Sequence, residues 1–142
     1  MAGYSNTPLV KKLGLKNGME ACILAAPPHY ENILGGLPPG VRIKARGAVD
    51  FVHLFTTSAA ALNRQFPSLK KRLKPNGLLW VSWPKGTSKI ATDLSRDVVR
   101  EIGLAGGLVD VKVCAVDDDW SGLKFVYRVA TVRHDQALEG HR

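Results

Sequence analysis

The feature that most constrains how this chain folds is the alternation of strand-like and helix-like segments along it. Three runs are apolar almost throughout: EACILAA at 20–26, DFVHLFTT at 50–57 and LLWVSW at 78–83. Continuous apolar runs of this length are typical of strands buried on both faces of a parallel sheet. Because the segments between them have helical character, the order predicts helices on both faces of that sheet. The predicted fold class is therefore α/β, a single three-layer Rossmann-like domain with a mostly parallel sheet.

The intervening segments carry residues that mark helix boundaries. Thr7 is expected to cap a short first helix, and Ser58 is expected to cap a longer one that continues through SLKKRL. Pro67 lies within that second helix and predicts either a kink or two abutting helices. A further helix is expected from about Thr92 to Ile102, ended by the glycines that begin at Gly103.

The last part of the chain has a different period. The runs VDVKVCAV at 109–116 and GLKFVYRVA at 122–130 alternate between apolar and polar residues and are joined by DDDWS. A period of two on both sides of a turn predicts an antiparallel hairpin, which gives the sheet a mixed edge. We expect one α/β domain over residues 1–132 and a flexible polar tail over residues 133–142.

Charge and composition limit the classes of partner and compartment. The 142 residues carry a formal net charge of +8 at pH 7, which points to an acidic partner such as nucleic acid or a phosphorylated ligand. The basic residues are spread along the chain, so solubility is the favoured explanation and nucleic acid the lesser one. No apolar run is long enough to span a bilayer and no apolar signal core is present, so a cytoplasmic protein without a membrane partner is expected. Cys22 and Cys114 fall in strand-like runs and are expected to be reduced.

Several stretches resemble the class I methyltransferase variant of the Rossmann fold. LGLKNGMEACILAA is similar to the entry into that family's first strand, and DFVHLF to its central strand that begins with an aspartate. LKPNGLLWVSWP, followed by a helix and a final hairpin, is similar to the family's later strands. The resemblance covers most of the chain, with one strand-helix unit of the full fold missing.

A second resemblance is more specific and covers nearly the whole chain. YSNTPLVKKLGLKNG, DFVHLFTTS, LLWVSWPKGTSKIATDLSRDVVRE and GLVDVKVCAVDDDWSGLKFV together resemble the bacterial domain-of-unknown-function 3052 family. This resemblance implies a small cytoplasmic bacterial protein. It carries over no activity and no catalytic residues.

The residues that a Rossmann cofactor site requires are not found at their places. Glycines should follow the first strand, where the backbone approaches a phosphate or the cofactor, but Pro27 and Pro28 stand there without an N–H to donate. An acidic residue should end the second strand, where VRIKARG supplies Lys44 and Arg46 instead. Two requirements fail independently, so no cofactor is expected.

Other catalytic motifs are also missing. PKGTSK is not a P-loop, because its lysines and hydroxyls do not have the G-x-x-x-x-G-K-[ST] spacing, and no G-x-S-x-G nucleophile motif occurs. Asp117, Asp118 and Asp119 lack the spacing of a calcium loop and are expected to form a solvated turn. No metal site is therefore expected, and His53, inside a buried run, is expected to be a hydrogen-bonded core histidine.

The candidate ligand site lies where the predicted strands end. Ligands of open parallel sheets bind beyond the carboxyl ends of the strands, and Lys85 and Lys89 follow one such end, close to the start of the next helix. The alternative is that Trp83 packs in the core, the lysines are solvated, and Thr92 or Asp93 merely caps the helix. The residues expected at the site are Trp83, Lys85, Ser88, Lys89, Thr92, Asp93, Thr56, Ser58 and His29.

These patterns favour a non-catalytic binding or interaction module on a degenerate methyltransferase-like fold. Its expected partner is an anionic small molecule or nucleotide held beside Lys85 and Lys89. Two alternatives stay open, a divergent S-adenosylmethionine-dependent methyltransferase and a basic protein associated with nucleic acid.

Overall fold

Each apolar run of the sequence forms a strand of one six-stranded sheet. The computed structural model describes residues 7–128, and its strands are β1 (Glu20–Leu24), β2 (Arg42–Ile43), β3 (Val49–Phe55), β4 (Leu73–Pro84), β5 (Val109–Ala115) and β6 (Trp120–Val126). Their order is β2-β1-β3-β4-β6-β5, in which β1 to β4 are parallel and β6 is antiparallel to both β4 and β5. The predicted fold class and the predicted hairpin are confirmed.

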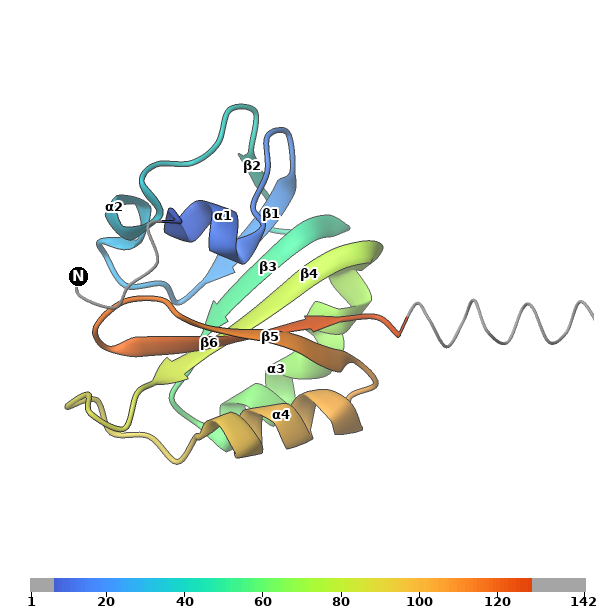
Figure 1. Cartoon of the computed structure of the whole chain (residues 1–142). Helices are drawn as coiled ribbons and strands as arrows, with labels where there is room; N and C mark the ends of the chain where they lie inside the picture. The colour runs from blue at the N-terminus through green and yellow to red at the C-terminus, as the bar shows by residue number, and fades with distance from the viewer. Residues whose placement is uncertain (1–6, 129–142) are drawn as a thin grey trace, which may run out of the picture.

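Helices cover both faces of the sheet (Figure 1). They are α1 (Leu9–Leu13), α2 (Tyr30–Leu34), α3 (Ala59–Arg72) and α4 (Arg96–Ala105). Leu62, Phe66 and Val99 from α3 and α4 pack into one core cluster, on one side of the sheet. Leu13 and Leu34, from α1 and α2, belong to a second cluster on the other side. The result is three layers, as the sequence predicted.

The start and end of α4 differ from the prediction. The helix begins at Arg96 rather than Thr92, and its N-cap is Ser95, whose hydroxyl accepts the N–H of Val98. Gly103 does not end the helix but lies inside it. A Cβ at that position would lie 2.0 Å from a ring carbon of Phe125, so the absence of a side chain lets α4 lie close to β6.

The other helix boundaries are closer to expectation. Ser58 caps α3 as predicted, by accepting the N–H of Ala61. Helix α3 is a single element that contains Pro67, so the expectation of two abutting helices is wrong. Helix α1 has Pro8 rather than Thr7 at its N-cap position. The domain limit expected at residue 132 and the tail expected at 133–142 lie outside the described residues.

A cluster of ion pairs links the amino-terminal parts of the parallel strands. The Glu20 carboxylate lies 2.8 Å from Lys74 Nζ, 2.9 Å from Arg42 Nη2 and 3.3 Å from Lys44 Nζ. The hydrogen bonds from Lys74 and Lys44 hold the pKa of Glu20 at about 2, well below its usual 4.5. Asp50 accepts the backbone N–H of Glu20 and also pairs with Lys74. The cluster fixes the register at the end of the sheet away from the candidate site.

None of the helices described is long and apolar enough to cross a membrane.

Candidate functional site

A cavity of about 620 Å³ opens where β4 ends and α4 begins. We call it the rim cavity, because it lies at the edge of the sheet formed by the carboxyl ends of β1 to β4. Open parallel sheets bind their ligands at this edge. Its polar lining residues are Lys85, Ser88, Lys89, Thr92, Ser95, Arg96 and Ser121.

The loop that forms the floor of this cavity is held by backbone hydrogen bonds. The N–H of Lys85 donates to the carbonyl of Asp119 over 2.8 Å, which fixes the loop to the β5–β6 turn. The N–H of Ser88 donates back to the carbonyl of Lys85, and the Ser88 hydroxyl accepts the N–H of Ile90. The two lysines therefore project from a folded turn rather than from an extended strand.

The rim cavity favours an anion. Lys85, Lys89 and Arg96 all line it, and the lining residues include no carboxylate. The first turn of the ten-residue helix α4 also faces the cavity through Ser95 and Arg96. Backbone N–H groups of a first turn lack partners within the helix and carry its positive dipole end, so they stabilise a negative charge.

Trp83 lines the rim cavity but belongs mainly to the core. Its side chain packs in the cluster beneath α3 and α4 and is 6% exposed. Little of the ring therefore remains exposed for contact with a ligand. Trp83 therefore forms part of the wall of the cavity.

Four other predicted site residues make structural contacts at the neighbouring strand end. The Asp93 carboxylate accepts the N–H of Ala59 at the start of α3, and the Thr92 hydroxyl donates to the carbonyl of Thr57 over 2.6 Å. Ser58 caps α3, and the Thr56 hydroxyl accepts the Ser58 N–H. Of these four residues, only Thr92 lines the rim cavity.

His29 lies away from the rim cavity. Its Nε2 is 3.1 Å from a carboxylate oxygen of Asp117. This contact joins the loop after β1 to the turn between β5 and β6. His29 therefore holds two loops of the rim together and does not line the cavity with Lys85 and Lys89.

Three polar residues of the rim cavity, Ser95, Arg96 and Ser121, are absent from the predicted site. The predicted helix begins at about Thr92 and so contains Ser95 and Arg96. Because the helix begins four residues later than expected, Arg96 occupies its first turn and lines the cavity. A serine followed by a predominantly helical run is a capping signal, but Thr92 and Asp93 carry the same signal.

A buried hydrogen-bonded chain lies beneath the rim on the side of α1 and α2. The Tyr30 hydroxyl is 2.8 Å from His53 Nδ1, and His53 Nε2 is 2.8 Å from Ser82 Oγ. His53 and Ser82 are fully buried, and burial lowers the pKa of His53 from 6.5 to about 3. The ring is therefore neutral at pH 7, so one nitrogen donates and the other accepts. His53 is the hydrogen-bonded core histidine that the sequence predicted.

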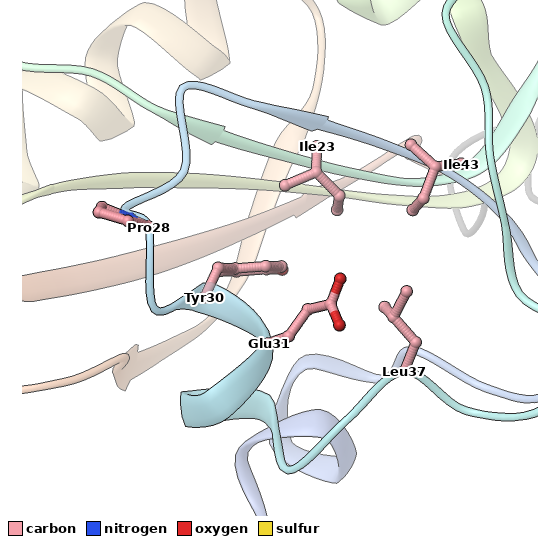
Figure 2. Close-up of a pocket in the computed structure, with 6 residues that line it drawn as sticks. All are labelled: Ile23, Pro28, Tyr30, Glu31, Leu37 and Ile43. Atoms are coloured by element: carbon pink, nitrogen blue, oxygen red, sulfur yellow. The ribbon is translucent and has the colours of Figure 1, made fainter.

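Tyr30 also forms a wall of a second, smaller cavity of about 390 Å³ (Figure 2). The walls contributed by Ile23, Leu37 and Ile43 are apolar, and the Glu31 carboxylate projects into the space between Tyr30 and Leu37 (Figure 2). Burial raises the pKa of Tyr30, so its hydroxyl stays protonated and cannot serve as a base near neutral pH.

Comparisons with known proteins identify the fold. No protein-family model matches the sequence, and a search of curated proteins finds no relative. Solved structures do match: a SAM dependent methyltransferase from Aquifex aeolicus aligns with a TM-score of 0.61 and 15% identity, over 82% of this chain and 86% of that one. Magnesium protoporphyrin IX methyltransferase from Synechocystis, solved with bound SAH, aligns with a TM-score of 0.56 and 12% identity, over 84% and 78%.

A third similar structure is a tRNA methyltransferase from B. subtilis, with a TM-score of 0.55 and 10% identity over 87% of this chain and 67% of that one. At these identities the likeness shows the fold alone. The chain has a methyltransferase-like Rossmann fold, and the resemblance to the domain-of-unknown-function 3052 family stays a prediction.

The turn after β1 lacks the glycines and the N–H donors that a Rossmann cofactor site places there. Ala25, directly after β1, has φ of 58°, a left-handed conformation that favours glycine, so the turn has the shape of a glycine turn but carries a Cβ. Pro27 and Pro28 follow without N–H groups. After β2, Lys44 stands where the second strand of a Rossmann site ends in an acidic residue, and its ammonium group pairs with Glu20; the carboxylate near this strand end is that of Glu31 from α2, in the smaller cavity.

Among residues 7–128, no group of three or more histidines, cysteines or carboxylates is placed to hold a metal ion.

Proposed function

We propose that this protein is a non-catalytic binding module that holds a small anionic ligand, such as a nucleotide or another phosphorylated molecule, in the rim cavity. The observation that carries the proposal is that Lys85, Lys89 and Arg96 line one cavity at the start of α4 with no carboxylate among them. A phosphate there meets three cations and the positive end of a helix. Ser88, Ser95 and Ser121 supply hydroxyl groups for its remaining oxygens.

The chemistry of the lining supports binding rather than catalysis. A serine hydroxyl becomes a nucleophile when a base lies within hydrogen-bonding distance of it. No histidine and no carboxylate lines the rim cavity, so its hydroxyls have no such partner. Both ring nitrogens of the buried His53 are hydrogen-bonded, one to Tyr30 and the other to Ser82.

The experiment is a thermal-shift screen with nucleoside mono-, di- and triphosphates and inorganic phosphate, followed by calorimetry. A ligand at about 100 times its Kd raises the free energy of unfolding by about 2.7 kcal/mol. The Lys85→Ala, Lys89→Ala variant should weaken the Kd at least about tenfold, because it removes two charge-assisted hydrogen bonds. The matched control is Arg64→Ala, Lys71→Ala, which removes two exposed cations of α3 outside the cavity. A ligand that binds both variants as it binds the wild type would place the site elsewhere.

A second candidate function is a divergent S-adenosylmethionine-dependent methyltransferase. The fold shared with the Aquifex aeolicus and Synechocystis methyltransferases favours it, and the turn after β1 opposes it. Calorimetry with S-adenosylmethionine discriminates between the two. A saturable isotherm that survives the Lys85→Ala, Lys89→Ala substitutions would support the methyltransferase.

A further inference from the structure

Four lysines gather on the face of the sheet opposite α3 and α4, away from the rim cavity. Lys124 on β6 stands directly opposite Trp80 on β4, and Trp80 belongs to the core cluster under α1 and α2. Lys112 on β5 stands directly opposite Lys124. Paired residues of neighbouring strands point to the same face, so both lysines lie on the side of α1.

Helix α1 and the residues after it complete the group. The Lys112 ammonium group donates to the backbone carbonyl of Lys12 over 3.2 Å. Burial raises the pKa of the Cys114 thiol overall, whereas the charges of Lys112, Lys12 and Lys124 all lower it, so the three ammonium groups lie around one side chain. Burial and the nearby charges of Lys112 and Lys16 lower the pKa of the Lys124 ammonium group. We call Lys12, Lys16, Lys112 and Lys124 the lysine platform.

Repulsion among the lysines of the platform lowers the unfolding free energy of the free protein. Like charges directly opposite each other on neighbouring strands are destabilising. The contact of Lys124 with the Trp80 ring, at 5.8 Å from its centroid, and the carbonyl beneath Lys112 offset part of that cost. Among the described residues, no ion pair joins a carboxylate to any of the four lysines. A partner that supplies several negative charges relieves this repulsion when it binds.

We infer that the lysine platform binds the phosphodiester backbone of a nucleic acid, without reading its sequence. A duplex carries one negative charge per about 1.7 Å of its axis, so several phosphates reach four clustered lysines at once. The net charge of +8 favours such a polyanion at long range.

The other polyanionic partners fit less well. Protein–protein interfaces are depleted in lysine, which argues against an acidic protein. Stable attachment to an anionic membrane combines charge with an inserted apolar face or lipid. Helix α1 has five residues, too few for an interfacial helix. Two exposed apolar residues, Val111 and Val113, flank Lys112 on β5, but Val113 stands opposite Leu123 of the core cluster under α3 and α4, on the other face of the sheet.

The test is fluorescence anisotropy with a short RNA duplex, the matching DNA duplex and a single strand of each, as a function of salt. Each phosphate contact contributes about 0.9 to the slope of log K against log salt for a duplex, so Lys112→Gln, Lys124→Gln should lower the slope by about 2. The melting temperature of this variant should not fall, because the substitutions relieve repulsion. The Lys112→Arg, Lys124→Arg variant should keep the wild-type slope.

Two controls separate the lysine platform from net charge and from the rim cavity. Arg64→Gln, Lys71→Gln changes the net charge equally on helix α3, and Lys85→Ala, Lys89→Ala removes two cations of the rim cavity; both should retain the slope. The inference is overturned by an unchanged slope in Lys112→Gln, Lys124→Gln, or by an equal loss in the α3 control. Binding to phosphatidylserine vesicles without binding to any oligonucleotide would overturn it as well.

Discussion

Protonation of His53 should make the protein lose stability at mildly acidic pH. Its ring is fully buried, and burial lowers its pKa from 6.5 to about 3. The unfolded chain therefore binds a proton at this residue over a pH range in which the folded protein does not. The contribution to stability is complete above pH 6.5 and is lost as the pH falls towards 3.

The magnitude follows from the linkage relation. One pH unit within this range costs about 1.4 kcal/mol, so lowering the pH from about 7.5 to about 5 should remove about 2 kcal/mol of unfolding free energy. Glu20 does not contribute in this range, because its pKa is lowered from 4.5 to about 2 and its effect comes at lower pH. The pH range therefore separates the effect of His53 from that of Glu20.

The assay is urea unfolding of the wild type and of His53→Phe across this pH range. The variant leaves the hydroxyls of Tyr30 and Ser82 without their partner, which lowers stability by about 1–3 kcal/mol at every pH. The wild type should lose about 2 kcal/mol more than the variant between about pH 7.5 and about pH 5. Ser82→Ala keeps the buried ring and should keep the pH dependence. Equal pH dependence in the wild type and His53→Phe would refute the reasoning.

Two further predictions concern packing and charge. In urea unfolding, Gly103→Ala should lower the unfolding free energy by about 1–3 kcal/mol, because its Cβ would overlap Phe125. Gly86→Ala, whose Cβ would meet no atom within 4 Å, should leave the unfolding free energy nearly unchanged. Glu20→Gln should be less stable than the wild type above pH 4.5, and the difference should shrink as the pH falls towards 2 and disappear below it, where the wild-type carboxylate is protonated. Parallel acid titrations of both proteins followed by circular dichroism would show whether the two curves converge.

The strands were predictable because a strand buried on both faces has apolar residues at consecutive positions. EACIL and DFVHLF are apolar on both faces because helices cover both faces of the parallel sheet. The start of α4 was not predictable, because Thr92, Asp93 and Ser95 can all cap a helix. Tertiary contacts decide among them. The Thr92 hydroxyl donates to the carbonyl of Thr57 and the Asp93 carboxylate accepts the N–H of Ala59, so Ser95 is the residue that caps α4.

Part of the candidate site was predictable from its position directly after an apolar strand. Lys85 and Lys89 follow an apolar strand directly, so their place at the rim follows from sequence order. The place of Trp83 could not be decided from the sequence, since apolar residues at a strand end face either the core or the cavity. The chain from Tyr30 through His53 to Ser82 joins residues 23 and 29 positions apart, and no local pattern reveals such partners.

The turn after β1 gives the last prediction, which concerns S-adenosylmethionine. Ala25 keeps the left-handed backbone of a glycine turn, so Ala25→Gly removes the Cβ without changing the path of the chain. Binding should still be absent in this variant, because Pro27 and Pro28 cannot donate hydrogen bonds and Lys44 remains bound to Glu20. Calorimetry at physiological cofactor concentration should therefore show no saturable heat for either protein. A micromolar isotherm for Ala25→Gly alone would mean that a single Cβ closes the site, and one for the wild type would mean that backbone contacts elsewhere on the rim replace the glycine turn.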